Sequence, residues 1–194
     1  MKTLVSVCLL CVLVAAPALA QANGASARPK AAAAPVANPI TAGTKTAYDM
    51  VNGWVTASAA AASDAVYAFK PAPEVRSFGQ IIGHVANANY MICSAAAAEK
   101  SPASGDIEKT KTTKADLVKA LGDSFAYCDT VYARMTDKTG AETVTFMLGA
   151  DMAKLSVLAF NTAHDFEHYG NLVTYMRLNK MVPPSSQGRG GMAP

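Results

Sequence analysis

The sequence predicts an all-α protein, a four-helix bundle within a single domain. Four long segments repeat apolar residues at spacings of three and four, which line one face of a helix. Prolines, glycines and polar residues separate these segments and end the helices. No run of alternating apolar and polar residues indicates strands, and 194 residues suit one ordinary domain.

Residues 1–20 are predicted to be a secretory signal peptide. Lys2 supplies a positive start, and an apolar run extends from Leu4 to Ala16. Small residues then permit cleavage before Gln21. Because the apolar run is too short to span a membrane, we expect an exported, periplasmic or secreted protein with no membrane attachment after cleavage.

The mature chain is expected to carry a small positive charge. Cleavage removes Lys2, so 17 basic residues become 16 against 14 acidic ones, a net charge of +2. No basic stripe accompanies this charge, which argues against nucleic acid as a partner. Cleavage also removes Cys8 and Cys11, and it leaves Cys93 and Cys128 in a compartment that permits a disulfide.

Two segments flank the expected fold. Residues 21–41 are rich in Ala, Pro, Gly and Asn without apolar periodicity, which predicts a disordered linker. Residues 185–194 contain three glycines and are predicted to form a flexible tail. The bundle is therefore expected over residues 42–184.

The first two helices are predicted from their apolar stripes and their ends. The first runs from about Lys45 to Ala62, and two prolines shortly after Phe69 prevent its continuation. Its buried stripe consists of Tyr48, Val51, Val55 and Ala59. The second opens at Ser77, which has capping-box spacing to Gln80, and runs to about Ala98.

The third and fourth helices follow a polar loop over residues 100–111. The third begins near Thr113, and its buried stripe consists of Leu117, Leu121, Phe125, Cys128, Tyr132 and Met135. Residues 142–148 fit either an extended segment or a helical turn. Asp151 is expected to cap the fourth helix, which runs to about Asn179 before the Pro183-Pro184 pair.

The candidate functional site lies in the fourth predicted helix, at His164-Asp165-Phe166-Glu167-His168. Residues four apart share a helix face, so both imidazoles can reach one cation. His84 in the second helix is the third of three histidines in the chain. Spacing alone leaves two readings open, a three-histidine metal site or polar residues on a solvated helix face.

Two other metal-site patterns do not match this stretch. A zincin protease carries its general-base Glu directly after the first histidine, where this chain has Asp165. A di-iron bundle needs two Glu-x-x-His motifs, and Ile81 precedes His84 by three residues. Polar residues that could support the histidines share one helical strip or flank it: Asn161, Asp165, Asn171 and Tyr175.

Two motifs carry a resemblance to a known family. The first is Arg76-Ser-Phe-Gly-Gln-Ile-Ile-Gly-His84, and the second is His164-Asp-Phe-Glu-His-Tyr-Gly-Asn-Leu, followed by Tyr175-Met-Arg177 and the proline pair. Over about residues 44–186 the chain resembles the DinB-like, YfiT-related superfamily of metal-binding four-helix bundles. It departs from the family's usual residues at Asn171 and Lys180, neither of which is a ligand position.

The resemblance implies more than the spacing does. It implies an up-down-down-up bundle with a crossover loop between helices two and three, and a divalent metal held by His84, His164 and His168. Zinc is the first expectation, and nickel, manganese or iron also suit imidazole ligands. Characterised members include thiol-dependent transferases and isomerases, so a low-molecular-weight thiol is an expected substrate.

Two functions therefore remain open for the exported protein. In the first, the metal activates a thiol or water, as in a transferase or hydrolase. In the second, the bundle binds metal or supports structure without turnover. A fourth protein ligand would favour the second function, and an open pocket beside the metal would favour the first. The sequence specifies neither the oligomeric state nor the catalytic residues.

A Cys93–Cys128 disulfide is expected if the second and third helices run parallel, as the resemblance implies. Each cysteine then stands roughly 22–24 Å from its helix start, at the same level. In an antiparallel pair the levels would differ by about 10 Å, too far for a bridge. The alternative is two buried free thiols that pack as small apolar groups.

Overall fold

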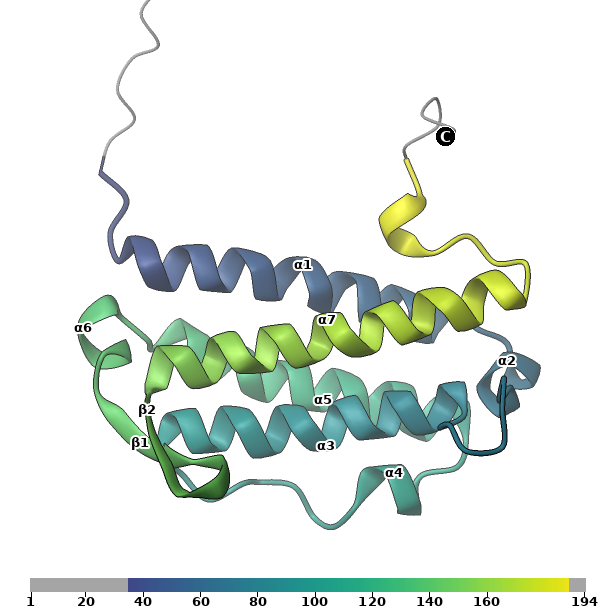
Figure 1. Ribbon diagram of the computed structural model, residues 1–194, viewed down its shortest axis with the longest axis horizontal. Coiled ribbons are helices and arrows are strands. Elements are labelled where there is room, and N and C mark those ends of the chain that lie inside the picture. The colour runs from purple at the N-terminus through teal and green to yellow at the C-terminus, as the bar shows by residue number, and fades with distance from the viewer. Residues whose placement is uncertain (1–34, 189–194) are drawn as a thin grey trace, which may run out of the picture. The chain divides into compact units, whose positions relative to one another are not determined.

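Four long helices form the body of the protein, which a computed structural model describes over residues 35–188. They are α1 (Pro39–Ala61), α3 (Phe78–Ala97), α5 (Lys114–Ala133) and α7 (Lys154–Leu178), and they lie side by side (Figure 1). The shorter elements are α2 (Asp64–Ala68), α4 (Ile107–Thr110), α6 (Asp137–Gly140), β1 (Thr143–Phe146), η1 (Met147–Gly149), β2 (Ala150–Ala153) and η2 (Pro184–Ser186). The predicted signal peptide lies outside the described residues.

Helix α1 starts earlier than predicted, inside the stretch assigned to the linker. It begins at Pro39, a residue whose fixed φ suits the first helical position. The carboxylate of Asp137 in α6 accepts hydrogen bonds from the backbone N–H groups of Ile40 (3.2 Å) and Thr41 (2.8 Å). A distant side chain thus satisfies the free donors of this helix end, which the local sequence could not indicate.

The predicted starts of α3 and α5 are confirmed. Ser77 caps α3, and its reciprocal hydrogen bonds with Gln80 complete a capping box. Thr113 caps α5 by accepting a hydrogen bond from the backbone N–H of Asp116. Both helices therefore begin where a side-chain oxygen replaces the missing backbone acceptor.

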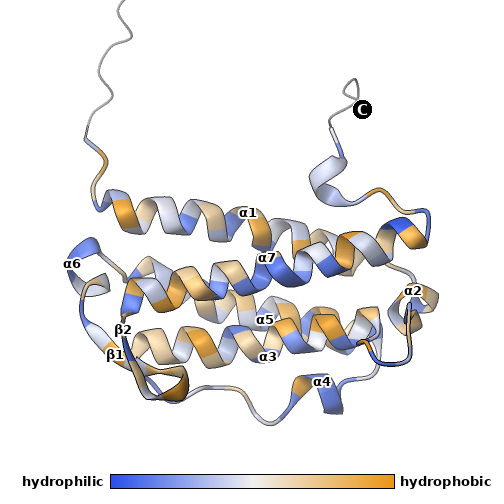
Figure 2. Ribbon diagram, viewed as in Figure 1, coloured by the Kyte–Doolittle hydropathy of each residue, from blue (hydrophilic) through white to orange (hydrophobic). Residues whose placement is uncertain are grey.

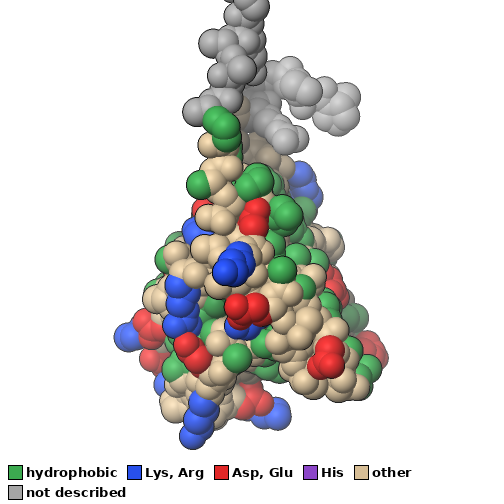
Figure 3. All heavy atoms as spheres, turned by 90° about the vertical axis from the view of Figure 1, so that its left-hand side faces the viewer, with side chains coloured by type: hydrophobic (Ala, Val, Ile, Leu, Met, Phe, Trp, Pro, Cys, Tyr) green, Lys and Arg blue, Asp and Glu red, His purple; other side chains and the backbone are tan. Residues whose placement is uncertain are grey.

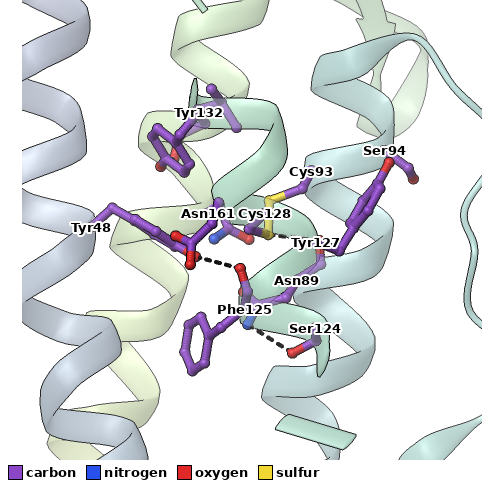
Figure 4. Close-up of a disulfide and its surroundings, with 12 residues drawn as sticks. Tyr48, Asn89, Cys93, Ser94, Ser124, Phe125, Tyr127, Cys128, Tyr132 and Asn161 are labelled. Atoms are coloured by element: carbon purple, nitrogen blue, oxygen red, sulfur yellow. Dashed lines mark hydrogen bonds between the residues drawn. A yellow bond between two sulfur atoms is a disulfide. The ribbon is translucent and has the colours of Figure 1, made fainter. Parts of the chain in front are cut away.

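The pair formed by α3 and α5 is parallel and covalently linked. Asn89 of α3 donates a hydrogen bond to Ser124 of α5 (3.3 Å), and four residues further on Cys93 forms a disulfide with Cys128. The contacts advance in the same direction on both helices, so the helices run parallel. The predicted disulfide is confirmed, with the two Cα atoms 5.4 Å apart and both cysteines buried (Figure 4).

The connection between α3 and α5 runs back along the bundle and contains α4 (Figure 1). It was expected to be an irregular polar loop. Asp106 caps α4, and Ile107 is buried beneath the segment. A single apolar anchor therefore fixes an otherwise hydrophilic crossover against the helices (Figure 2).

The predicted start of the fourth helix is wrong. Asp151 lies in β2, which pairs antiparallel with β1, and its carboxylate accepts a hydrogen bond from Thr145 of β1 (2.9 Å). Helix α7 begins at Lys154 and has no side-chain cap. The ambiguous stretch 142–148 is thus mostly extended, and its partner strand takes the residues that were assigned to the helix.

Aromatic residues join α1, α5 and α7 around one core. Tyr48 of α1 stacks on Tyr132 of α5 with ring centroids 4.3 Å apart, and Trp54 stacks on Tyr169 of α7 at 5.2 Å. The Tyr132 hydroxyl donates to the Leu158 carbonyl of α7 (2.9 Å). Within residues 35–188, no helix combines the length and the apolar character needed to cross a bilayer.

The two ends of the bundle are built from different elements. Figure 3 looks onto the end that carries α6 and the β1–β2 hairpin, where acidic, basic and apolar side chains are intermixed and no histidine is visible among the coloured atoms. Near the other end, the start of the predicted tail folds back, because the Ser185 hydroxyl accepts a hydrogen bond from the Tyr169 hydroxyl (2.8 Å). Ser185 and Ser186, the first residues of the predicted tail, therefore belong to a packed turn, whereas residues 189–194 lie outside the described residues.

Candidate metal centre

Three histidines from two helices converge on one point. His84 comes from the first half of α3, and His164 and His168 lie on consecutive turns of α7. The Nε2 atom of His164 is 3.2 Å from Nε2 of His84 and 3.1 Å from Nε2 of His168. Among the described residues this is the group of potential ligands that could hold one ion, with ligand atoms within 4.8 Å of one another.

The spacing of these nitrogens fits a metal ion. Two nitrogens that each lie about 2.0–2.1 Å from a tetrahedral zinc are about 3.3 Å apart. Hydrogen bonds alone explain the cluster less well, because Nε2 of His164 faces two other nitrogens and can carry only one proton. A divalent cation would satisfy all three lone pairs at once.

Burial keeps two of these imidazoles neutral. Burial, followed by the positive charge of the neighbouring histidines and Arg76, lowers the pKa of His168 to about 3. Burial and the charge of Arg76 also lower the pKa of His84. Neutral imidazole is the form that can bind a metal ion, so His84 and His168 are in the protonation state that a metal site requires.

These pKa shifts predict how pH affects the metal-free protein. Below the ordinary histidine pKa of about 6.5, the unfolded chain binds protons at His84 and His168 that the folded chain does not. Burial raises the pKa of Asp165 to about 6, so this residue acts in the opposite direction and offsets one of the two. The net effect is a loss of stability as pH falls from about 6.5 to 4.

Thermal unfolding in the presence of a chelator would measure this effect. We expect a lower Tm at pH 5 than at pH 7. In His168→Ala one of the two histidine contributions is absent and Asp165 remains, so the difference should be smaller than in the wild type. A metal-free protein whose Tm rises on acidification to pH 5 would contradict the predicted neutral state of the histidines.

Two of the predicted supporting residues lie beside the histidines. The Asn171 amide is 3.3 Å from Nδ1 of His168. If Nε2 of His168 is free to bind a metal ion, the ring proton is on Nδ1. The Asn171 side chain must then accept this proton through its oxygen, which requires a 180° rotation of its amide group. Asp165 is completely buried, and its Oδ1 is 4.0 Å from Nδ1 of His164.

The other two predicted supporting residues contact neighbours of the histidines and not the histidines themselves. Asn161 donates a hydrogen bond to Oδ2 of Asp165 (3.2 Å) and thereby fixes that carboxylate. Tyr175 donates to the backbone carbonyl of Arg76 (2.8 Å), which leads into α3. Neither residue has a hydrogen bond to a histidine. Helical phase therefore predicted correctly that both lie on the same strip of α7 as the histidines, but it could not predict which side chains they contact.

Sequence reasoning missed Glu108, which lies in α4. Its Oε2 is 3.4 Å from Nδ1 of His84, and its Oε1 accepts a hydrogen bond from Nε of Arg76 (2.9 Å). Periodicity could not find it, because the residue belongs to the crossover and reaches the site only through the tertiary fold.

An open cleft of about 610 Å³ borders His168. Arg76, Glu108, Asn171 and Tyr175 are among the residues that line it, together with exposed Lys70, Glu74 and Glu167. A larger hollow of about 790 Å³ contains Gln80 and Glu108 but no histidine. The first cleft therefore gives a small polar molecule access to His168.

The fold and the site define the class of this protein, a four-helix body with a candidate three-histidine metal site between two of its helices. Residues 47–172 match the family model described as the DinB superfamily. The match spans most of the four-helix body and both histidine motifs, and the chain belongs to this superfamily. No curated protein matched the chain in sequence.

Solved structures share the fold at low sequence identity. A DinB-like protein from Bacillus cereus ATCC 10987 superposes with a TM-score of 0.64 and 17% identity, covering 74% of this chain and 95% of that one. A DinB-like protein from Bacillus subtilis gives 0.57 and 18%, with 78% and 99% covered. The mycothiol-dependent maleylpyruvate isomerase gives 0.57 and 14%, with 68% of this chain and 60% of the isomerase covered.

Proposed function

We propose that this DinB-superfamily protein is exported and binds one divalent metal ion, zinc in the first instance, through His84, His164 and His168. The observation that carries the proposal is that Nε2 of His164 lies 3.2 Å from Nε2 of His84 and 3.1 Å from Nε2 of His168. The proposal includes the up-down-down-up order of the four long helices, supported by the parallel pair α3 and α5 and by the long crossover between them (Figure 1).

A metal in this site would act as a Lewis acid that lowers the pKa of a thiol or water molecule. The chain's own groups would then position the reactants. The three imidazoles hold the ion, Asn171 orients the ring of His168, and the cleft beside His168 admits the substrate. We propose a low-molecular-weight thiol as that substrate, because the maleylpyruvate isomerase with the same fold depends on mycothiol.

A catalytic role is favoured over a purely structural metal site. A structural zinc site is usually closed by four protein ligands, whereas a catalytic site keeps a position open. Among the described residues the cluster offers three ligands, and the cleft lies against one of them. The alternative of a bundle that binds metal without turnover predicts a fourth ligand, which this arrangement does not supply.

Metal analysis of protein purified without a histidine tag, followed by a thiol-transfer screen, tests the proposal. We expect about one divalent ion per chain and metal-dependent consumption of a thiol such as mycothiol or glutathione. Protein that binds neither zinc, nickel, manganese nor iron would overturn the metal site. Stoichiometric metal with no turnover on any thiol or ester substrate would favour the non-catalytic alternative.

Export makes a separate prediction about the mature protein. We expect expression in a bacterial host with a secretion pathway to yield a chain that begins at Gln21 and appears in the periplasm or medium. Intact-mass measurement of the fractionated protein would detect the loss of residues 1–20. An uncleaved chain retained in the cytoplasm would contradict export.

A further inference from the structure

The crossover segment carries a carboxylate that belongs to the metal centre. We infer that Glu108 is a positioning residue for His84, and that Gly83 is the residue that allows α4 to bring it there. The inference rests on the proposed metal site and extends it to a part of the chain outside both histidine motifs.

The two oxygens of Glu108 have separate partners. One accepts a hydrogen bond from Arg76 at 2.9 Å, and the other faces Nδ1 of His84 at 3.4 Å. When Nε2 of His84 binds a metal, its proton resides on Nδ1 and can be donated to this carboxylate. Such a contact fixes the ring orientation and makes the imidazole a stronger ligand.

The approach of α4 to α3 depends on a missing side chain. A Cβ atom added to Gly83 would lie 2.7 Å from Cα and 3.1 Å from N of Glu108, both backbone atoms that a side-chain rotation cannot move away. Gly83 directly precedes the metal ligand His84 in the sequence. The residue type at position 83 therefore sets how closely the carboxylate can reach the imidazole.

Other contacts hold α4 in this register. The side-chain amide of Asn87, one turn beyond Gly83, donates to Asp106 (2.7 Å) and accepts from the backbone N–H of Ile107 (2.8 Å). Ile107 is buried, so the segment is anchored immediately before Glu108. The position of the carboxylate is thus specified by polar and apolar contacts that are independent of its own charge.

Zinc affinity of purified full-length protein tests the role of Glu108. Glu108→Gln retains the size of the side chain but removes its charge, and we expect zinc binding to weaken about 10- to 100-fold, as for other residues that support a metal ligand. The visible spectrum of the Co²⁺-loaded protein should also change, because the field of the His84 ligand changes. If Glu108 only held α4 in place, a folded Glu108→Gln variant would keep the wild-type zinc affinity and the wild-type Co²⁺ spectrum.

Glu99→Gln is the matched control. Glu99 also pairs with an arginine, Arg134, at 2.8–2.9 Å, so this substitution removes the same charge and the same kind of ion pair away from the site. It should leave zinc affinity and the Co²⁺ spectrum unchanged. Wild-type affinity in Glu108→Gln would overturn the inference while leaving the metal site intact, whereas a wild type that binds no metal would overturn both.

A double-substitution cycle tests the role of Gly83. Gly83→Ala should also weaken zinc binding, and Gly83→Ala combined with Glu108→Gln should bind no more weakly than the weaker single variant, because both changes break one contact. Losses that multiply would show that Gly83 acts separately and would overturn its assigned role. If Gly83→Ala does not fold, as judged by circular dichroism, Glu108→Gln alone still decides the role of the carboxylate.

Discussion

Replacement of His168 by alanine is expected to weaken metal binding by about two to three orders of magnitude. Structural zinc in small four-ligand sites contributes about 10–16 kcal/mol, so one ligand accounts for roughly 3–4 kcal/mol, or about 10²- to 10³-fold in affinity. His168 is the most buried of the three ligands, with 7% of its surface exposed, so water is poorly placed to replace it. Titration with a competing chelator would measure the loss.

The control for this variant lies on the same helix. Thr174 is exposed on α7, and its hydroxyl contacts only the carbonyl of Gly170 (3.3 Å), so Thr174→Ala should retain full metal affinity. The far-ultraviolet spectrum of His168→Ala should match that of the wild type, because the four-helix core does not include this side chain. A folded His168→Ala protein with unchanged affinity would show that the converging nitrogens are not the metal site.

Local patterns predicted the parts of this protein that local physics controls. The apolar stripes located the four long helices, since each helix buries one face against the others. Ser77 and Thr113 marked helix starts because each caps its own helix through a contact within three residues. The spacing of four between His164 and His168 placed both on one face, because a helix has 3.6 residues per turn.

Features that depend on distant contacts could not be predicted in this way. Asp137 extends α1 by nearly two turns from almost a hundred residues away, and β1 and β2 form only because each supplies the other's partners. Glu108 reaches His84 only because Gly83 admits α4. The histidines themselves are visible in the sequence, but the groups that orient them come from the tertiary fold.

Removal of the Cys93–Cys128 disulfide is expected to cause the largest loss of stability among single covalent changes to the described part of the chain. The bridge joins residues 35 apart, and in the chain-entropy model a loop of that length contributes about 4 kcal/mol at 25 °C. Both cysteines are buried between α3 and α5 (Figure 4). We therefore expect the Cys93→Ala/Cys128→Ala protein to unfold about 8–15 °C lower than the wild type.

Thermal unfolding of the double variant, followed by circular dichroism with and without reductant, would measure this difference. Alanine is the appropriate replacement, because serine would bury two hydroxyls at positions that now hold sulfur. When the wild type is unfolded and refolded in reductant, its disulfide is reduced, and its Tm should fall towards that of the variant. The same treatment should leave the Tm of the variant unchanged. Alkylation and mass spectrometry of untreated protein should find no free thiol. Two free thiols, or a double variant as stable as the wild type, would contradict the stabilising role of the disulfide. The parallel register of α3 and α5 would then depend on packing alone, through the hydrogen bond between Asn89 and Ser124 and the apolar contacts around it.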